Sequence, residues 1–167
     1  MIRIADAVPE NVDAMLRVTA KPPTLHLDRI TSARAGTWLR YLVVFHGDDL
    51  CGFGCLFLSK PPDKPDLDPV PQLIDLNIRP DKRGQGLGSA LIQTMVRIAK
   101  EDGLKRIYIS PDLSGNPRTL GLYERLGFVV SSEPYWEDWS YVDTAGRVHG
   151  GGYWTLRMTM DLSQGKP

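Results

Sequence analysis

Glycine alternates with larger residues in the run Arg83-Gly84-Gln85-Gly86-Leu87-Gly88, and a helical pattern of apolar residues begins at the same point. Glycines leave the backbone amides around them uncovered by side chains. The first turn of a helix adds unpaired N–H groups and the positive end of a dipole, which together favour an anion. The run therefore predicts a helix start that holds a phosphate group.

Composition limits the class of protein to which this phosphate cradle belongs. The 167 residues are 42% hydrophobic and 24% charged, so we expect one globular domain over residues 1–167. The 20 basic and 20 acidic residues balance, which argues against a nucleic acid or a membrane surface as partner. Since no apolar run has the length of a membrane span and the first residues do not resemble a signal peptide, we expect a cytoplasmic protein.

Two cysteines, Cys51 and Cys55, lie in one short apolar run. No further cysteine or histidine lies at metal-ligand spacing from them, so we expect no metal site. On a strand they would share one face yet lie too far apart to form a disulfide easily. Buried, reduced thiols are the expectation, in agreement with a cytoplasmic protein.

The order of apolar runs and turn residues predicts one α/β domain. We predict strands at 2–4, 41–45, 51–58, 73–78, 107–109, 128–130 and 153–162, and helices from Pro9 to about residue 18, at 27–35, at 85–102 and from Asn116-Pro117 to Gly127. Prolines between residues 60 and 71 predict a surface loop. Gly52 and Gly54 indicate a bulge or a close backbone approach, and residues 134–153 are expected to be irregular, with a turn near 143–146.

Three kinds of phosphate cradle compete for the glycine run. A nucleotide-triphosphate loop requires Lys-Ser/Thr after its last glycine, whereas Gly88 is followed by Ser89-Ala90. A dinucleotide fingerprint requires G-x-G-x-x-G after a first strand, whereas this run has G-x-G-x-G after a later one. The third pattern, Arg/Gln-x-x-Gly-x-Gly/Ala, is matched by Arg83, Gly86 and Gly88.

Two blocks of the chain together resemble the GNAT superfamily of N-acetyltransferases. Residues 74–88 resemble the cofactor-binding core of the family, and residues 116–128 resemble its Asn…Leu-Tyr-Glu-x-Leu-Gly-Phe signature. The resemblance implies a single-domain fold with a central mixed, mostly antiparallel twisted sheet of six to seven strands, flanked by about four helices. It also implies a V-shaped splay after the fourth strand.

The resemblance implies acetyl-CoA as co-substrate and no metal. In the family, the backbone of the splayed fourth strand pairs with the pantetheine amides in the manner of an added strand. Carried over to this chain, the residues implied in binding acetyl-CoA are Leu76, Asn77 and Ile78 on the strand, Arg83, Gly84, Gln85, Gly86, Leu87, Gly88 and Ser89 around the pyrophosphate, and Asn116 and Tyr123 beyond it.

Acetyl transfer requires a neutral amine, a donor for the developing oxyanion and an acid for the leaving thiolate. Tyr123 matches the family's general acid, and packing on its helix is the alternative role. The glutamate that some relatives use as a base is absent from residues 109–112. Asp75, acting through a water, is our candidate base, with an exposed side chain as the alternative, and Asp112 and Glu133 are further candidates.

Histidines are not favoured as the base. His26, His46 and His149 are scattered along the chain, and we expect each of them in a loop or on the surface.

The segment from Glu133 to Tyr141 concentrates aromatic and acidic residues. Aromatic faces and carboxylates both attract cationic amines, so the segment is a candidate acceptor pocket, with Glu137 and Asp138 as its charges. The alternative is a small core beneath a long loop.

We therefore expect an N-acetyltransferase that acts on a primary amine of a small molecule, cationic in this interpretation. A protein N-terminal or lysine acetyltransferase and a non-catalytic acyl-CoA sensor or interaction module are the alternatives. A homodimer is one alternative for its assembly.

Overall fold

A seven-stranded sheet forms the centre of the computed structural model, which describes residues 1–62, 65, 71–115 and 118–163. Its strand order is β1-β2-β3-β4-β5-β9-β6. The strands are β1 (Ile2–Asp6), β2 (Leu39–His46), β3 (Asp49–Phe57), β4 (Gln72–Ile78), β5 (Arg106–Ile109), β6 (Val129–Val130) and β9 (Met158–Asp161). Within this sheet the β4–β5 pair is parallel and the other pairs are antiparallel, which confirms the mixed, mostly antiparallel sheet.

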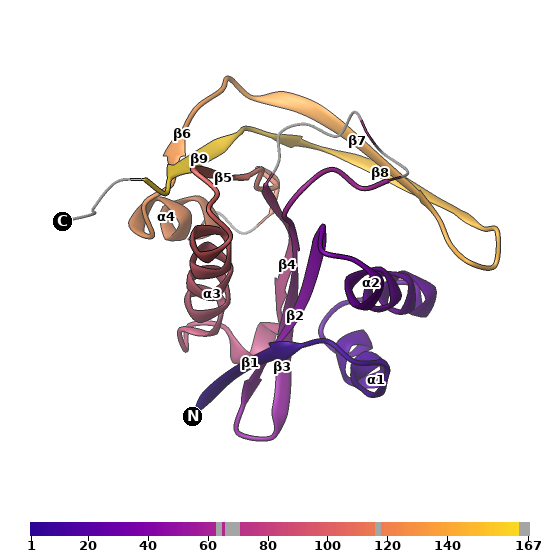
Figure 1. The fold of residues 1–167 in the computed structure, drawn as a ribbon. Helices are drawn as coiled ribbons and strands as arrows, with labels where there is room; N and C mark the ends of the chain where they lie inside the picture. The colour runs from indigo at the N-terminus through magenta and orange to yellow at the C-terminus, as the bar shows by residue number, and fades with distance from the viewer. Residues whose placement is uncertain (63–64, 66–70, 116–117, 164–167) are drawn as a thin grey trace.

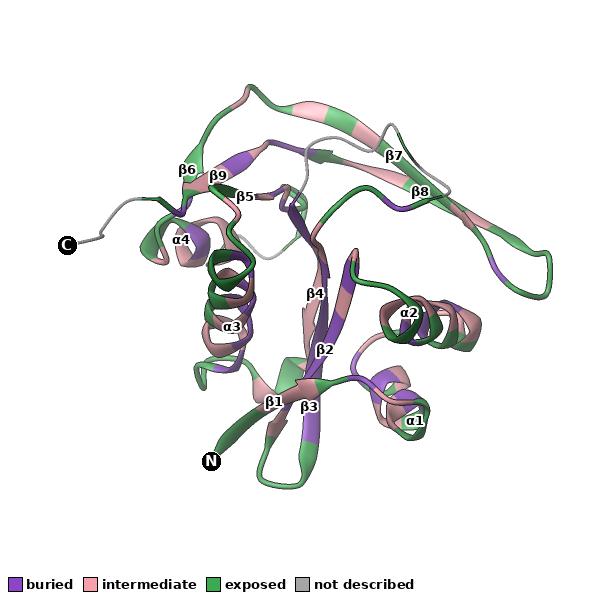
Figure 2. Ribbon diagram, viewed as in Figure 1, coloured by how far each residue is buried: buried purple, intermediate pink, exposed green. Residues whose placement is uncertain are grey.

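Helices cover both faces of the sheet (Figure 1). On one face lie α1 (Val12–Leu16) and α2 (Pro23–Ala35), and on the other lie α3 (Leu87–Glu101) and α4 (Arg118–Arg125). Each face has its own apolar cluster, which includes Met15 and Phe53 beneath α1 and α2, and Leu91 and Met95 beneath α3. Figure 2 shows the buried residues gathered where the strands meet these helices. In the described part of the chain, the four α-helices and the seven-stranded sheet match the predicted fold.

Three helix boundaries differ from the predicted ones, two of them at prolines. Pro9–Asn11 forms a 3-10 turn and the α-helix that follows ends at Leu16. The second helix, predicted to begin at residue 27, begins at Pro23, because proline lacks only an N–H that the first turn leaves unpaired in any case. The long helix begins at Leu87 rather than at residue 85.

A bulge in β3 separates the two cysteines. Val44 pairs with Gly52 and Phe45 with Leu50, so Cys51 is the extra residue and the alternation of side chains is interrupted there. Cys51 packs in the cluster beneath α3, and Cys55 packs in the cluster beneath α1 and α2. Both thiols are buried and free, as predicted, but the prediction that they share a face is wrong.

The glycines of β3 let neighbouring elements approach closely, as predicted. A Cβ at Gly52 would collide with the carbonyl oxygen of Asn77, and one at Gly54 would lie 2.8 Å from Cε of Met95. These contacts bring β4 and α3 directly against the middle of β3. The central part of β4 is thereby fixed in place.

The aromatic segment that we expected to be irregular is a second, two-stranded sheet. β7 (Tyr135–Val142) and β8 (Val148–Thr155) form an antiparallel hairpin, with its turn around Asp143–Gly146 as predicted. The hairpin arches over α2 and the end of β4 (Figure 1). The predicted final strand is divided, since β8 ends at Thr155 and β9 starts at Met158.

Candidate functional site

The edge of β4 that faces β5 is open along most of its length. The two strands pair only at Gln72–Tyr108 and Leu73–Ile109, although β4 continues to Ile78. The predicted splay after the fourth strand is therefore present. Leu76, Asn77 and Ile78 lie in the diverging part, where main-chain groups can pair with an extended chain that carries amides.

The glycine run forms the turn that connects the open end of β4 to α3. Gly84 and Gly86 have φ angles of +79° and +81°, and a Cβ on either would meet open space. The left-handed backbone, rather than crowding, explains these glycines. The amide of Ala90 makes the first helical bond, to the carbonyl of Gly86 at 3.0 Å, so the amides of residues 87–89 have no carbonyl partner within α3. This arrangement fits a diphosphate.

Charged side chains brace this turn. The Nε of Arg83 donates to the carbonyl of Ile78 at 3.2 Å, which connects the glycine run back to β4. Arg79 forms ion pairs with Asp49 at 2.9 Å and Asp81 at 2.7 Å. Arg79 is therefore paired with protein carboxylates, whereas Arg83 uses only its Nε in the bond to Ile78.

Tyr123 lies on α4, and its side chain is buried. Its side chain lies edge-on to Phe128 with ring centroids 6.2 Å apart, and 7% of the residue is exposed. Burial raises the pKa of Tyr123 to about 12, which keeps the phenol protonated at neutral pH. Asn116, the other residue expected from the second motif, lies outside the described residues.

Asp75 occupies an irregular position in β4. Phe53 pairs with Asn77 and Cys55 with Ile74, so two residues of β4 lie opposite Gly54, and Asp75 has a left-handed φ of 54°. Its carboxylate accepts from Nη1 of Arg29 at 2.6 Å and from Nζ of Lys21 at 3.0 Å.

The two ion pairs determine the proton affinity of Asp75. Burial alone would raise the pKa of the Asp75 carboxyl, but the positive charges of Arg29 and Lys21 hold this pKa at about 2. A carboxylate with so low a pKa is a weak acceptor for the proton of an amine. The geometry gives Asp75 a role in positioning the two cations and disfavours it as the base.

His26 is buried on α2, so the expectation of a loop or surface position is wrong for this residue. Its Nδ1 lies 2.7 Å from the hydroxyl of Tyr41. Burial, followed by the nearby Arg29, lowers the pKa of His26 to about 4. Because the helix starts at Pro23, His26 falls on the buried face together with Ile30, which the sequence pattern did not reveal.

Substitution of Asp75 tests how much its two ion pairs contribute to the free energy of unfolding. Asp75→Asn should lower the free energy of unfolding at neutral pH by about 2 kcal/mol, because the side chain is 15% exposed and its pKa is depressed. A depressed carboxyl pKa stabilises the fold above about pH 4, and this contribution is lost as pH falls toward about 2. Urea denaturation of wild type and variant should therefore show a difference that is constant between about pH 5 and 8 and shrinks below about pH 4.

Asp13→Asn is the matched control, since Asp13 is exposed on α1. It should change the free energy of unfolding by less than about 0.5 kcal/mol. A pH-independent loss in Asp75→Asn would contradict the assignment of charged ion pairs.

The β7–β8 hairpin turns one face toward the body of the protein. The hydroxyl of Tyr135 lies 3.4 Å from Oγ of Ser110, and that of Tyr141 donates to Asp28 at 3.1 Å. Since alternate residues of a strand share a face, Glu137 lies on the same inner face, opposite Tyr153 of β8. Burial and then Glu137 raise the pKa of Tyr153 to about 12.

The outer face of the hairpin carries the other acid of the segment. Asp138 is exposed and accepts from Nε1 of Trp136 at 2.8 Å. We expected Glu137 and Asp138 to be the charges of one pocket, whereas the structure places them on opposite faces of the hairpin.

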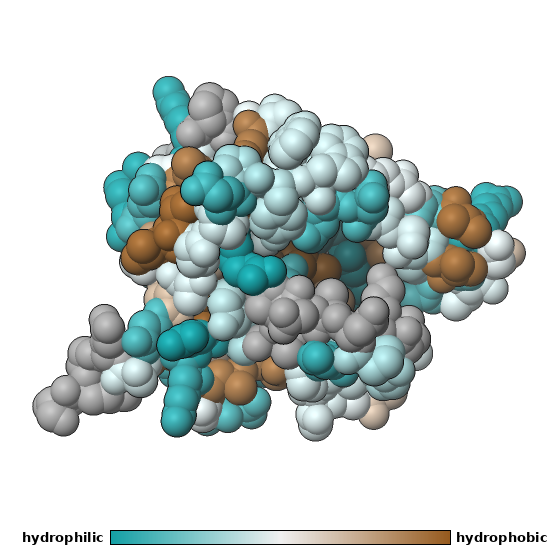
Figure 3. All heavy atoms as spheres, turned by 90° about the horizontal axis from the view of Figure 1, so that it is seen from above, coloured by the Kyte–Doolittle hydropathy of each residue, from teal (hydrophilic) through white to brown (hydrophobic). Residues whose placement is uncertain are grey.

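Polar contacts fasten the tip of the hairpin to α2. Thr24 donates to Asp143 at 3.1 Å, and Nε2 of His149 lies 2.9 Å from the same carboxylate. Seen from above, the surface of the molecule is hollowed near its middle, where hydrophobic and hydrophilic atoms both lie deep (Figure 3). The hairpin and α2 thus enclose one side of the space in front of β4.

The remaining candidate bases are less well placed. Asp112 accepts from the amide and the hydroxyl of Ser114 at 2.9 and 2.6 Å, and Glu133 is exposed before β7. His46 is exposed at the end of β2. Within the described ranges, no three His, Cys, Asp or Glu side chains cluster so that they could hold a metal, and no helix is long and apolar enough to span a bilayer.

Sequence comparisons identify related proteins. A model of the acetyltransferase (GNAT) family matches residues 12–128. An L-methionine sulfoximine/L-methionine sulfone acetyltransferase of Pseudomonas aeruginosa is 39% identical over 56 residues, which are 34% of this chain and 32% of that protein. Mycothiol acetyltransferase of Corynebacterium efficiens is 29% identical over 109 residues, 62% of this chain and 33% of that protein. The chain thus spans about a third of the length of these curated relatives.

Solved structures share the fold along the whole chain. PaiA N-acetyltransferase from Thermoplasma acidophilum, in complex with coenzyme A, has a TM-score of 0.68 at 15% identity and covers 96% of this chain and 99% of its own. YncA from Salmonella typhimurium, with its cofactor acetyl-CoA, has a TM-score of 0.68 at 16% identity and covers 100% of this chain and 97% of its own.

Proposed function

Because this chain belongs to the acetyltransferase (GNAT) family, we propose that it transfers the acetyl group of acetyl-CoA to a primary amine of a small molecule, by direct attack in a ternary complex. The observation that carries this proposal is the position of the open β4 edge directly before the amide cradle at the start of α3. One feature fits an extended chain with amides and the other fits a diphosphate, in the order in which coenzyme A presents them.

The residues that would hold acetyl-CoA follow from this order. The main chain of Leu76, Asn77 and Ile78 would pair with the pantetheine arm, and the amides from Gly84 to Ser89 would bind the diphosphate. When bound, acetyl-CoA supplies an activated thioester. Holding it and the amine in one cleft supplies most of the rate through proximity, so no covalent intermediate with the protein is needed.

The chemistry of transfer assigns separate roles to two side chains. The amine nitrogen forms a bond to the acetyl carbon and loses a proton, while the carbon–sulfur bond breaks and the sulfur gains a proton. Tyr123 would donate the proton to the sulfur, because its phenol stays protonated at neutral pH. Glu137 would bind and orient the incoming ammonium before it is deprotonated, since its carboxylate shares the inner face of the hairpin with Tyr153.

The contacts between the tip of the hairpin and α2 favour a small acceptor over a peptide. Tyr141 and Asp143 connect the hairpin to α2 and so restrict the acceptor side of the cleft. The names of the curated relatives above also point to small molecules as acceptors. A protein N-terminus or lysine remains the second candidate, because the likeness to solved structures extends to a ribosomal-protein-S18-alanine N-acetyltransferase from Escherichia coli.

The two faces of the hairpin provide a matched pair of variants. Glu137→Gln should raise KM for the acceptor about tenfold while KM for acetyl-CoA stays within about twofold, because one attractive charge contact is worth about 1.4 kcal/mol. Asp138→Asn, its neighbour on the outer face, should leave both constants unchanged. Steady-state kinetics measure this contrast, and equal effects of the two substitutions would contradict the proposed acceptor side.

Release of free thiol from acetyl-CoA, measured across a panel of small amines and a panel of peptides, tests the proposed function. We expect turnover with small amines and an acceptor whose mass increases by one acetyl group. Turnover of peptides alone would favour the second candidate. Tight binding of acetyl-CoA without turnover of any amine would instead favour an acyl-CoA sensor.

A further inference from the structure

Two cations share one carboxylate at the acceptor side of β4. Lys21, in the segment between α1 and α2, and Arg29, on α2, both pair with Asp75, which also accepts from Nδ2 of Asn77 at 2.9 Å. Three donors thus surround the carboxylate of Asp75, whereas each cation retains N–H donors that this carboxylate does not use. The side chains of Lys21 and Arg29 are 28% and 18% exposed, against 15% for Asp75, so the cations are the more accessible part of the cluster.

Among the residues that the structure describes, no neighbour balances one positive charge of this cluster. Its other polar neighbours are uncharged, because burial raises the pKa of Cys55 to about 12, raises that of Tyr41 and lowers that of His26 to about 4. Among the residues described, no second carboxylate lies within ion-pair distance of either cation. A structural ion pair needs one cation for one carboxylate, and a surplus charge in a partly buried site is costly unless a ligand compensates it.

The inner face of the hairpin carries a carboxylate. Asp75 lies at the bulge where the open edge of β4 begins. The hairpin arches over the end of this strand (Figure 1). Glu137 stands opposite Tyr153 on the inner face of the hairpin, and the charges of both Glu137 and Asp75 act on that phenol. The space between β4 and the hairpin therefore has cations on one side and a carboxylate on the other.

We propose that Lys21 and Arg29 bind a carboxylate of the acceptor, so that the acceptor is a zwitterion of the amino-acid class rather than a simple cation. That the amine is the group of this acceptor that is acetylated rests on the function proposed above. The amine lies toward Glu137 and the open edge of β4, while the carboxylate accepts from the unused donors of Lys21 and Arg29. Such a ligand matches both walls of the cleft at once, which a simple cation does not.

Calorimetric binding tests this subsite without relying on turnover. The probes are L-methionine and L-phenylalanine, their carboxamides, and the amines that result from removal of the carboxylate. At least one of the two amino acids should bind the wild-type protein about tenfold or more tightly than its carboxamide and its amine. Lys21→Met should reduce this preference to within about threefold, because the carboxylate of the amino acid loses a charged partner, whereas the carboxamides and amines have no carboxylate.

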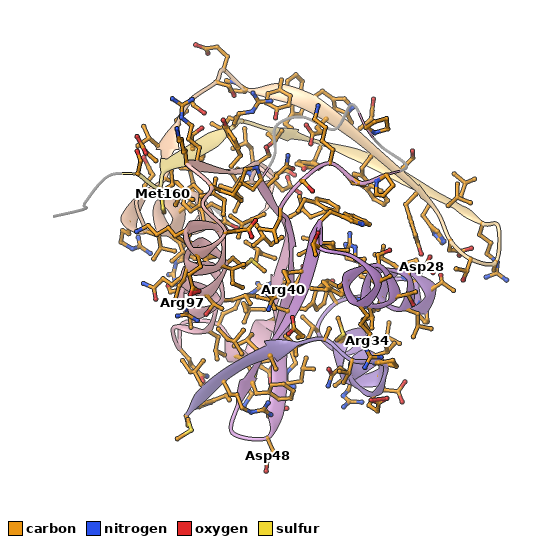
Figure 4. The ribbon with its side chains drawn as sticks, viewed as in Figure 1. Asp28, Arg34, Arg40, Asp48, Arg97 and Met160 are labelled. Carbon is orange, nitrogen blue, oxygen red and sulfur yellow. The ribbon has the colours of Figure 1, made fainter. Side chains whose placement is uncertain are left out.

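The chain offers a matched control on α2. Arg34 is exposed on the side of the helix away from the hairpin, and Arg34→Met should keep the full preference (Figure 4). Lys21→Gln is a second variant that retains polarity, and thermal unfolding of each variant shows that it is folded.

The possible outcomes separate this subsite from the proposed function. Preferred binding of an amino acid that is never acetylated would support the subsite and count against the enzyme. Turnover of amines with no preference for a carboxylate would support the enzyme and overturn the subsite. Equal binding of amino acids and carboxamides, no binding of either amino acid, or an unchanged preference in Lys21→Met would each overturn it.

Discussion

Gly86→Glu should raise the Kd for acetyl-CoA by about 100-fold or more, since a carboxylate about 4 Å from a phosphate charge opposes binding by about 4 kcal/mol at an effective dielectric constant of about 20. Gly86 is the residue before α3 and has open space where a side chain would project. The new carboxylate would therefore enter the region in which the amides of residues 87–89 are exposed. Isothermal titration of acetyl-CoA into the variant measures the effect.

Gly103→Glu is the matched control for Gly86→Glu. Gly103 follows the other end of α3 and has nearly the same backbone, with φ of +80° against +81°, and the same open surroundings. Both substitutions carry the same left-handed backbone penalty of roughly 1–2 kcal/mol, but only one lies at the cradle. Wild-type affinity for acetyl-CoA in a folded Gly86→Glu protein would refute the position of the cradle.

Tyr123→Phe should lower kcat about 100-fold and leave the Kd for acetyl-CoA within about twofold, as expected for loss of a general acid. The substitution removes one oxygen and retains the ring that packs against Phe128, so α4 should keep its position. Rapid-mixing assays with saturating substrates measure kcat, and calorimetry measures Kd. Full activity in this variant would exclude Tyr123 as the acid.

The pH dependence of kcat offers a second test of Tyr123. A general acid must carry its proton, and burial raises the pKa of Tyr123 to about 12. Loss of activity through ionisation of this phenol is therefore expected only as pH rises toward about 12, well beyond an ordinary assay. A basic limb near pH 9 that disappeared in Tyr123→Phe would show that the phenol ionises far more readily than its burial implies.

The turn between β4 and α3 was predictable from sequence because its signals are local. Glycines at Gly84 and Gly86 satisfy a left-handed backbone, and the apolar repeat from Leu87 to Met95 defines the buried face of α3. Gly52 and Gly54 indicated the close approach of neighbouring elements to β3, which fixes β4 in place. These features depend on residues within a few positions of one another.

The hairpin and the surroundings of Asp75 were predicted less well because they depend on register and long-range contacts. Aromatic residues occur on both faces of the hairpin, including Trp136 outside and Tyr141 inside, so the apolar–polar alternation of a half-buried strand is absent. The extra residue at Cys51 reverses the face of every following side chain in β3. The pairing of Asp75 with Lys21 and Arg29 joins segments more than 45 residues apart. Neither composition nor spacing contains that information.

Amide hydrogen exchange with and without acetyl-CoA tests most directly whether the open β4 edge and the amide cradle form the cofactor site. Exchange should slow most at residues 76–78 and 84–89 when saturating acetyl-CoA is added. A separate groove between β1 and α3, lined by Ile4, Thr94 and Arg97, should show no comparable change. Unchanged exchange at residues 76–78 and 84–89, or protection confined to the β1–α3 groove, would contradict the proposed site.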